Sequence, residues 1–413
     1  MKICVIGLGY IGLPTAAMFA SKGHNVIGVD KNEQIVSALN QGEIIIEEDH
    51  LAEFVKTAVT EGHLHGSLVP QEADAFIIAV PTPITDEKKA DMHFVKAAAE
   101  EITPYLRKGN LVILESTSPI GTVDDLICPI IAGSGLEIGS ELFVGHSPER
   151  VIPGKILYEL VHNSRIAGGI NQESAQRIAD LYRTFVEGEI YLTNARTAEL
   201  CKLAENTFRD INIAYANELA LICEKSGINV WEAISLCNNH PRVNIHQPGP
   251  GVGGHCIAVD PWFIVEKQPD TAKLIHQARL INDNMPAIVA QKIINLTQGQ
   301  DKPQVTILGV TYKPNVDDMR ESPILTLISH LKTTNIQVIA QDPFAKGYQG
   351  DPYQAAAGSD LLVLGVDHNI YRDLDLKRLA QAMRTAKLLD TRNFFDRQTT
   401  AAAGFEYHLL GDK

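Results

Sequence analysis

Apolar runs of strand length alternate with helical stretches along the first third of the chain. Residues 3–6 and 26–29 are apolar runs typical of buried strands, and residues 14–20 between them predict a helix. Two further segments, 73–83 and 111–122, each begin with an apolar run and end in a turn rich in proline, serine and threonine. Strands that alternate with helices in this way favour a doubly wound, mostly parallel sheet.

The turn after the first strand carries the spacing GxGxxG, at Gly7, Gly9 and Gly12. It follows a strand, opens a helix and precedes an acid, Asp30, at the end of the next strand, which is the context of a dinucleotide site. Gly7 permits the tight turn, Gly9 the approach of a pyrophosphate, and Gly12 the packing of helix on strand. Asp30 would accept hydrogen bonds from the adenosine ribose and repel a 2′-phosphate, so the motif favours NAD over NADP.

Two threonines follow later strands of the same predicted sheet. Thr82 and Thr117 stand where strands end, and ligands of doubly wound sheets lie beyond the carboxyl ends of strands. Both are therefore expected cofactor contacts, although turn threonines without a ligand would give the same pattern.

The middle of the chain holds one long helical pattern. Residues 196–225 contain neither glycine nor proline, Asn194 is a suitable N-cap, and Gly227 is a suitable stop signal. A helix of roughly 30 residues is about 45 Å long at ~1.5 Å per residue, which is enough to bridge two domains. Lys202, Asn206 and Arg209 share one face of it, a pattern that either a solvated surface or a polar site would give.

A second α/β unit is predicted from residue 304 onward. It lacks the full glycine motif, so no second NAD is expected there. The sequence thus predicts an α/β protein with two Rossmann-like, doubly wound domains joined by a helical central domain with a long bridging helix. We place these domains at residues 1–192, 193–300 and 301–413.

Composition restricts the partners. The 413 residues carry a formal net charge of −14, and an acidic chain repels a phosphate backbone, so nucleic acid is not an expected partner. No apolar run is long enough to span a membrane, and the chain forms a strand from its third residue, so neither a membrane anchor nor a signal peptide is expected. Six cysteines without a CxxC pair indicate a reducing cytoplasm. Cys237, His240, His255 and Cys256 lack the spacing of a standard zinc site, so no metal is expected.

Four glycines crowd in front of one cysteine in PGPGVGGHCIAVDPWF, residues 248–263. They stand at positions 249, 251, 253 and 254, before Cys256, and Asp260 follows the cysteine by four residues. One interpretation is a flexible turn before an inert buried thiol. The other is a backbone loop that lets a large substrate lie against main-chain amides and reach a reactive sulfur.

In order along the chain, the motifs GLGYIGLP, VPTP, ESTSPIGT, SPER, KLAENTFRDINIA, PGPGVGGHCIAVDPWF and YKPNVDDMRESP resemble those of the UDP-glucose/GDP-mannose dehydrogenase family. The resemblance covers nearly the whole chain. HPRVNIHQPGPGVGGHCIAVDPWF and PERVIPG resemble the branch that acts on UDP-N-acetyl-D-mannosamine. The resemblance implies an oxidoreductase that converts the C6 hydroxyl of a UDP-sugar to a carboxylate with two NAD per sugar. An aldehyde, a thiohemiacetal and a Cys256 thioester would be the intermediates, and the product would suit polysaccharide biosynthesis.

The resemblance also implies roles for single positions. Cys256 matches the catalytic thiol, Lys202 and Asn206 a polar pair on the helix, and Asp260 the acid after the thiol. Besides the three motif glycines, the implied cofactor positions are Tyr10, Ile11, Asp30, Thr82, Thr117 and Arg320. The implied substrate positions are Arg150, Val151, Lys202, Asn206, Arg209, His240, Arg242, Gly253, Tyr312 and Lys313. In the family, the arginine that matches Arg242 reaches the site of the neighbouring subunit, which implies at least a homodimer.

One departure bears on the substrate. Pro153 stands where UDP-glucose enzymes of the family carry an acid, which disfavours UDP-glucose and leaves Glu149 as the candidate for activating water. UDP-N-acetylglucosamine, UDP-glucose and GDP-mannose stay open as sugars. A one-step NAD-dependent hydroxyacid dehydrogenase of similar layout and a non-enzymatic NAD sensor stay open as functions.

Overall fold

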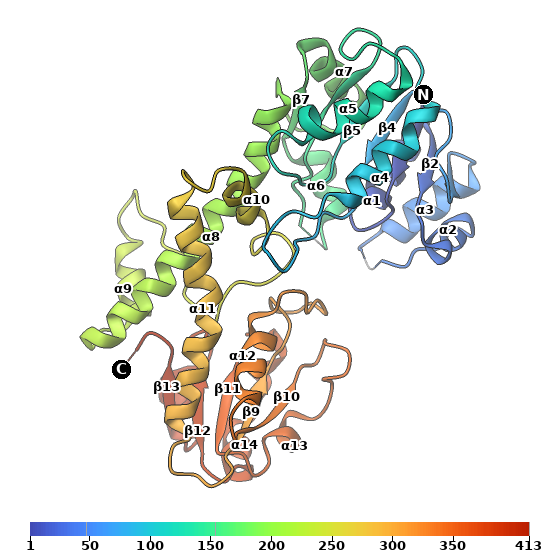
Figure 1. The fold of residues 1–413 in the computed structure, drawn as a ribbon. Coiled ribbons are helices and arrows are strands. Elements are labelled where there is room, and N and C mark those ends of the chain that lie inside the picture. The colour runs from blue at the N-terminus through green and yellow to red at the C-terminus, as the bar shows by residue number, and fades with distance from the viewer. Residues whose placement is uncertain (47, 153, 413) are drawn as a thin grey trace. The chain divides into compact units, whose positions relative to one another are not determined.

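The computed structural model describes residues 1–46, 48–152 and 154–412, so Pro153 lies outside the described residues. The chain forms two compact units, one of residues 1–205 with 262–268 and one of residues 206–261 with 269–413. The 32-residue helix α8 (Ala195–Ser226) contributes its first residues to the first unit and the rest to the second. Each unit contains one sheet (Figure 1).

The first unit is built on an eight-stranded sheet of order β3-β2-β1-β4-β5-β6-β7-β8. All neighbouring strands are parallel except β6 and β7, which are antiparallel. The strands are β1 (Lys2–Ile6), β2 (Asn25–Val29), β3 (Leu64–Ser67), β4 (Ala75–Ile78), β5 (Leu111–Leu114), β6 (Phe143–His146), β7 (Arg165–Gly169) and β8 (Ile190–Asn194). The helices are α1 (Gly12–Ser21), α2 (Glu33–Asn40), α3 (Leu51–Thr60), α4 (His93–Ile102), α5 (Cys128–Ile131), α6 (Ile156–His162) and α7 (Gln172–Tyr182).

Both faces of this sheet are covered, which explains why its central strands β1, β4 and β5 are almost entirely apolar. Alternate residues of β1 enter different cores. Ile3 and Val5 pack with residues of α1, α3 and α7, whereas Cys4 and Ile6 pack with residues of α4 and α5. The helices on the two faces therefore bury both sets of side chains.

The second unit is built on a five-stranded parallel sheet of order β10-β9-β11-β12-β13. Its strands are β9 (Gln304–Leu308), β10 (Gln337–Gln341), β11 (Leu361–Leu364), β12 (Lys387–Asp390) and β13 (Glu406–Leu409). Its helices, besides the part of α8, are α9 (Val230–Cys237), α11 (Lys273–Leu296), α12 (Pro323–Lys332), α13 (Pro352–Ala356), α14 (Leu376–Ala382) and α15 (Arg397–Ala402). Helix α10 (Asp260–Lys267) begins in this unit. Figure 1 shows α11 and α12 side by side along the sheet, and their residues share one apolar core with β9 and β11.

The predicted fold class is confirmed. The structure is α/β with two mostly parallel sheets and a long helix between them in sequence, and α8 begins where Asn194 Oδ1 accepts a hydrogen bond from the Thr197 N–H at 2.8 Å. Gly227 follows the helix with φ +69°, as a helix stop requires. The strands β3, β6, β7, β8 and β13 were not predicted from the sequence.

Candidate active site

The glycine motif has the geometry that its spacing predicts. Gly7 has φ +95°, and a Cβ there would lie 2.5 Å from the carbonyl oxygen of Ala79. A Cβ on Gly12 would lie 1.8 Å from the carbonyl oxygen of Gly7, so helix α1 needs glycine there to pack on the turn. A Cβ on Gly9, by contrast, would meet no described atom within 4 Å. Gly9 is thus the motif position at which the absence of a side chain leaves space for a ligand, whereas at Gly7 and Gly12 the protein itself fills that space.

The surroundings of this motif fit a dinucleotide. Helix α1 has neither an acidic residue in its first turn nor a side-chain cap from the described residues, so its amides and dipole remain available to an anion. Asp30 Oδ2 accepts a hydrogen bond from the Leu8 N–H at 2.9 Å and Oδ1 accepts one from the Asn32 N–H at 2.9 Å, which fix the carboxylate at the end of β2. Tyr10 is 40% exposed, and Ile11 is half-buried.

Thr82 and Thr117 are brought together in the first unit. The Thr82 hydroxyl donates to the carbonyl oxygen of Thr117 at 2.7 Å, and both side chains are half-buried. Their placement beyond β4 and β5 agrees with the position expected from the sheet order.

The predicted substrate positions Arg150, Val151 and Lys202 also lie in the first unit, and all three are half-buried. The Arg150 guanidinium pairs with Glu205 at 2.8 Å and donates to the carbonyl oxygen of Ser164 at 3.2 Å. Lys202 is close enough to His146, a fully buried side chain, to oppose its protonation. Burial is the larger cause, and together they lower the pKa of His146 to about 3.

Asn206, Arg209, Asp260 and Cys256 come together in the second unit. The Asn206 amide donates to Asp260 Oδ2 at 2.5 Å, and its oxygen accepts a hydrogen bond from Arg209. The Cys256 carbonyl oxygen accepts from the N–H groups of Val259 and Asp260, at 3.0 and 2.8 Å. This turn places the thiol one helical turn before the Asp260 carboxylate, which is 3% exposed.

At each of the four glycines before Cys256, an added side chain would meet neighbouring atoms of the same unit. A Cβ on Gly249 would lie 2.5 Å from the Arg392 guanidinium, and one on Gly251 would lie 2.8 Å from Pro323. A Cβ on Gly253 would lie 2.5 Å from the Glu321 carbonyl oxygen, and one on Gly254 would lie 2.8 Å from the Tyr312 ring. The missing side chains thus let the loop lie against its own unit, and the expectation that its main-chain amides meet a substrate stays a prediction.

The loop is also held by hydrogen bonds. The Gly249 N–H donates to Asn217 Oδ1 of α8 at 2.8 Å, and the Gly254 N–H donates to the Arg320 carbonyl oxygen at 3.0 Å. These bonds fix the backbone on both sides of the four glycines. Cys256 consequently follows a segment whose backbone is hydrogen-bonded at Gly249 and Gly254.

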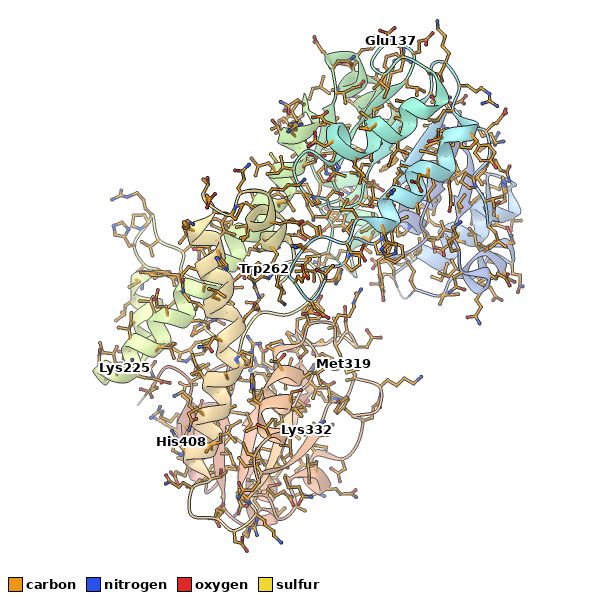
Figure 2. The ribbon with its side chains drawn as sticks, viewed as in Figure 1. Glu137, Lys225, Trp262, Met319, Lys332 and His408 are labelled. Carbon is orange, nitrogen blue, oxygen red and sulfur yellow. The ribbon has the colours of Figure 1, made fainter. Side chains whose placement is uncertain are left out.

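Tyr312, Lys313 and Arg320 lie in one loop between β9 and α12. The Lys313 ammonium lies 5.8 Å from the centre of the Tyr312 ring, and Arg320 pairs with Asp318 at 2.7 Å. Figure 2 labels Met319 in this loop and Lys332 at the far end of α12, so the loop lies at the N-terminal end of that helix. His240 and Arg242 are exposed, and the Arg242 N–H donates to His240 Nδ1 at 3.3 Å.

A hollow of about 770 Å³ on the second unit contains none of the predicted site residues. It is lined by Ile213, Trp231, Ile234, Ser235, Asn238, Asn239, Asn244, Ile245, His246 and Gln247. Because its lining includes none of the predicted catalytic residues, we do not assign it to the reaction centre.

Comparisons with known proteins assign the chain to a family. Profiles of the UDP-glucose/GDP-mannose dehydrogenase family match in three segments, the NAD binding domain at residues 1–186, the central domain at 196–284 and the UDP binding domain at 306–397. The chain belongs to the UDP-glucose/GDP-mannose dehydrogenase family.

The chain is also similar to individual members of this family. It is 48% identical to a UDP-N-acetyl-D-mannosamine dehydrogenase of Methanocaldococcus jannaschii over 100% of this chain and 96% of that protein. It is 45% identical to an NDP-N-acetyl-D-galactosaminuronic acid dehydrogenase of Ralstonia nicotianae over 97% of both chains. The solved structure of a UDP-D-ManNAc dehydrogenase from Pyrococcus horikoshii is similar with a TM-score of 0.94, at 38% identity over 100% of this chain and 99% of that one.

The predicted site residues are distributed over the three matched segments. The NAD binding segment holds all of the predicted cofactor positions except Arg320, which falls in the UDP binding segment. The central segment holds Lys202, Asn206, Cys256 and Asp260, and the UDP binding segment holds Tyr312 and Lys313. The family match thus supports NAD as the cofactor and a UDP-sugar as the substrate class of this dehydrogenase. None of the helices in the described part of the chain has the length and apolar character that crossing a bilayer requires.

This dehydrogenase also contains a buried ionic cluster that its sequence did not predict. Glu115, Glu149 and Arg165 form it with Tyr182, and Arg165 and Tyr182 carry no motif that would single them out. Only the fold brings together residues that are so distant in sequence. Glu115 and Glu149 could each be found from the sequence, since they lie in the motifs ESTSPIGT and SPER, but their sharing of Arg165 could not.

Proposed function

We propose that this protein catalyses the NAD-dependent, four-electron oxidation of the C6 hydroxyl of UDP-N-acetyl-D-mannosamine to UDP-N-acetyl-D-mannosaminuronate. The observation that carries the proposal is that Cys256 lies one turn before Asp260, whose carboxylate accepts a hydrogen bond from the Asn206 amide of α8, in a chain with a full-length relative named for this substrate. The relative from Ralstonia nicotianae supports a second candidate, the same chemistry on another nucleotide N-acetylhexosamine.

NAD would be held by the first unit. Gly9 leaves room for the pyrophosphate beside the uncapped start of α1, and Asp30 is placed for the ribose hydroxyls. Tyr10, Ile11, Thr82 and Thr117 would contact it further, as would Arg320. When bound, NAD accepts hydride.

The thiol is needed for the second oxidation. The carbonyl carbon of an aldehyde cannot give up a hydride until a nucleophile adds to it. The addition turns the carbonyl oxygen into an alkoxide, which can then expel the hydride. The Cys256 thiolate adds to give a thiohemiacetal, whose oxidation leaves a thioester. Water then adds to the thioester carbon, the C–S bond breaks, and the carboxylate and the thiol are released.

Polar groups of the chain would stabilise the oxygen at C6. Asn206 keeps one amide N–H beyond the one that it donates to Asp260, and this N–H can donate to the developing alkoxide. Lys202 supplies a positive charge for the same oxygen. Either Lys202 or a water molecule held by Asp260 takes the hydroxyl proton in the first step, and Glu149 takes the proton of the attacking water in the last.

The remaining predicted positions would bind the nucleotide sugar. Arg150, Val151, Arg209, His240, Gly253, Tyr312 and Lys313 are proposed to contact it, and Arg242 is proposed to reach the neighbouring subunit. Arginine and lysine suit the diphosphate charge, and arginine suits bidentate contacts.

A homodimer is supported by an apolar stripe on α8. Phe208, Tyr215 and Ile222 are spaced by seven residues, so they share one face, and they are 62%, 50% and 53% exposed. We also keep the domain limits 1–192, 193–300 and 301–413, supported by the three matched segments. A cytoplasmic location is supported by six cysteines that all carry thiols rather than disulfides.

The experiment is a panel of UDP-N-acetylmannosamine, UDP-N-acetylglucosamine, UDP-N-acetylgalactosamine, UDP-glucose and GDP-mannose with NAD⁺. The NADH formed per sugar is counted and the product is identified by mass spectrometry. We expect two NADH per UDP-N-acetylmannosamine and a uronate product. One NADH per sugar would favour a one-step dehydrogenase, and NAD binding without turnover on any sugar would favour a sensor.

A further inference from the structure

The strongest unexplained feature of the first unit is a buried cluster in which two carboxylates share one guanidinium. The Glu115 side chain is 0% exposed, that of Arg165 6% and that of Glu149 9%. Arg165 pairs with Glu115, and its Nη1 lies 3.1 Å from Glu149 Oε2. A structural ion pair needs only one carboxylate, and a second buried negative charge is costly to desolvate. Such an arrangement is a sign of a functional rather than a purely structural role.

All three nitrogens of the Arg165 guanidinium are used, each toward a different residue. Nε donates to Ser147 Oγ at 2.9 Å, Nη1 donates to Glu149, and Nη2 donates to Glu115. Ser147 and Glu149 belong to the segment that follows β6, which forms neither helix nor strand up to residue 152. The Ser147 N–H still donates to the Leu114 carbonyl oxygen at 3.0 Å. The Glu149 side chain is held at both oxygens, because Oε2 accepts from Arg165 and Oε1 accepts from the Arg150 N–H at 2.5 Å.

Glu115 in turn holds Arg165. Its Oε1 accepts a hydrogen bond from the Tyr182 hydroxyl at 2.9 Å, and its Oε2 accepts one from the Thr15 hydroxyl at 3.2 Å. The guanidinium carbon of Arg165 also lies 3.7 Å from the centre of the Tyr182 ring, in a cation–π contact. Thr15 belongs to α1, the helix of the glycine motif, so the cluster joins that helix to the segment of Glu149.

We propose that Arg165 and Glu115 are positioning residues for the Glu149 carboxylate, so that they set the rate at which the thioester is opened by water. The proposal rests on the function proposed above, in which Glu149 takes the proton of that water. The step itself balances without another reactant: water adds to the thioester, its proton passes to Glu149, and the sulfur leaves as thiolate.

The test uses Arg165→Lys in the full-length protein. Lysine keeps the positive charge but has a single ammonium, which cannot reproduce the planar fork that reaches Ser147, Glu149 and Glu115 at once. We expect thioester opening to slow by at least about tenfold, the loss of roughly one positioned charge-assisted hydrogen bond. Rapid mixing should then show a burst of two NADH per site followed by slow turnover, and mass spectrometry should show an acyl adduct at Cys256.

The matched control is Arg183→Lys. Arg183 pairs with Asp180 at 2.8 Å just after α7, the helix that carries Tyr182, but this pair is about half exposed. The control should behave as the wild type. If Arg165→Lys opens the thioester at the wild-type rate, or if it weakens NAD binding, oxidation and hydrolysis equally, the positioning role is wrong.

Glu115→Gln provides a second, gentler variant in case Arg165→Lys does not fold. The Gln oxygen can still accept from Tyr182 and Arg165, and its amide can donate to the Thr15 hydroxyl, so only the charge is lost. The charged or titratable groups that act on Glu115 are Arg165, Glu149 and Tyr182; His146, near Arg165, stays neutral. Burial raises the pKa of Glu115 to about 7, partly opposed by Arg165.

The rate of thioester opening in the wild type should therefore show an inflection near pH 7 that Glu115→Gln lacks. An inflection that persists unchanged in Glu115→Gln would overturn the proposal. The proposed function is tested separately by the wild-type protein. If the wild type makes fewer than two NADH per sugar, that function is wrong, whatever the variants show.

Discussion

Replacing single glycines of the first turn should separate the fold of this protein from its cofactor binding. Gly9→Ala adds a methyl group where no described atom lies within 4 Å, and Gly9 does not need a positive φ. The change should leave the free energy of unfolding within about 1 kcal/mol of the wild type, since a compatible Gly→Ala change stabilises by ~0.4–1 kcal/mol. Gly12→Ala adds its methyl group 1.8 Å from the Gly7 carbonyl oxygen, which the backbone must move to accommodate. It should cost about 3 kcal/mol or more.

The two variants should also differ in NAD affinity. The methyl group of Gly9→Ala occupies the space that the pyrophosphate needs, so the phosphate moves away from the amides at the start of α1. The loss of one charge-assisted hydrogen bond of ~1.5–3 kcal/mol corresponds to a Kd that rises about 10- to 100-fold. Titration calorimetry with NAD⁺ measures the Kd, and chemical denaturation followed by circular dichroism measures stability.

The control is Gly350→Ala in the second unit. Gly350 also has no described atom within 4 Å of its Cβ position and needs no positive φ, so it matches Gly9 in everything except the motif. Gly350→Ala should change neither the Kd for NAD⁺ nor the free energy of unfolding. If Gly9→Ala binds NAD as tightly as Gly350→Ala does, or if it destabilises the protein as much as Gly12→Ala, then the space at Gly9 is not the pyrophosphate position.

Three further outcomes are expected. Cys256→Ser should reduce uronate formation by several orders of magnitude because a hydroxyl is a far weaker nucleophile than a thiolate, and wild-type-like activity would contradict the thioester route. Phe208→Asp with Tyr215→Asp should convert a dimer into monomers in sedimentation experiments, whereas an unchanged mass would remove the α8 stripe from the interface. Burial raises the pKa of Glu199, which accepts hydrogen bonds from the N–H groups of Gly121 and Val123, from 4.5 to about 7. The contribution of Glu199 to the free energy of unfolding is complete below pH 4.5 and is lost as the pH rises to about 7. At ~1.4 kcal/mol per pH unit the loss is about 3 kcal/mol. Glu199→Gln should therefore make the measured decline of stability with pH shallower.

The sequence predicts those parts of the molecule that local chemistry determines. The motif at Gly7 and Gly12 imposes its own turn, and the long helix α8 follows from an uninterrupted pattern with a cap at Asn194. The pair Asn206–Asp260 was expected to act together only because of the family resemblance, since the two residues are 54 positions apart. The pairing of Arg165 with Glu115 was not predictable, because the two residues are 50 positions apart and Arg165 lies in no recognised motif.

The two sheets show how the same opening turn can serve different ligands. The second sheet begins like the first, with Gly309 at φ +85° after β9 and Asp342 at the end of β10, as Gly7 follows β1 and Asp30 follows β2. The position of Gly9, however, is taken by Thr311, whose buried hydroxyl donates to the Lys313 carbonyl oxygen at 3.0 Å.

Asp342, unlike Asp30, is closed to any ribose. It is 0% exposed and accepts hydrogen bonds from the N–H groups of Val310, Thr311, Phe344 and Ala345, and its Oδ2 lies 2.9 Å from His368 Nε2. These bonds outweigh its burial and lower its pKa to about 2, so the carboxylate stays charged and serves the loop rather than a ligand. The second sheet therefore offers a dinucleotide neither a glycine position with space for the pyrophosphate nor an available carboxylate for the ribose. What the loop presents instead is the half-buried lysine Lys313, a point charge suited to a phosphate group, and this difference follows from one threonine in place of one glycine and one aspartate turned inward.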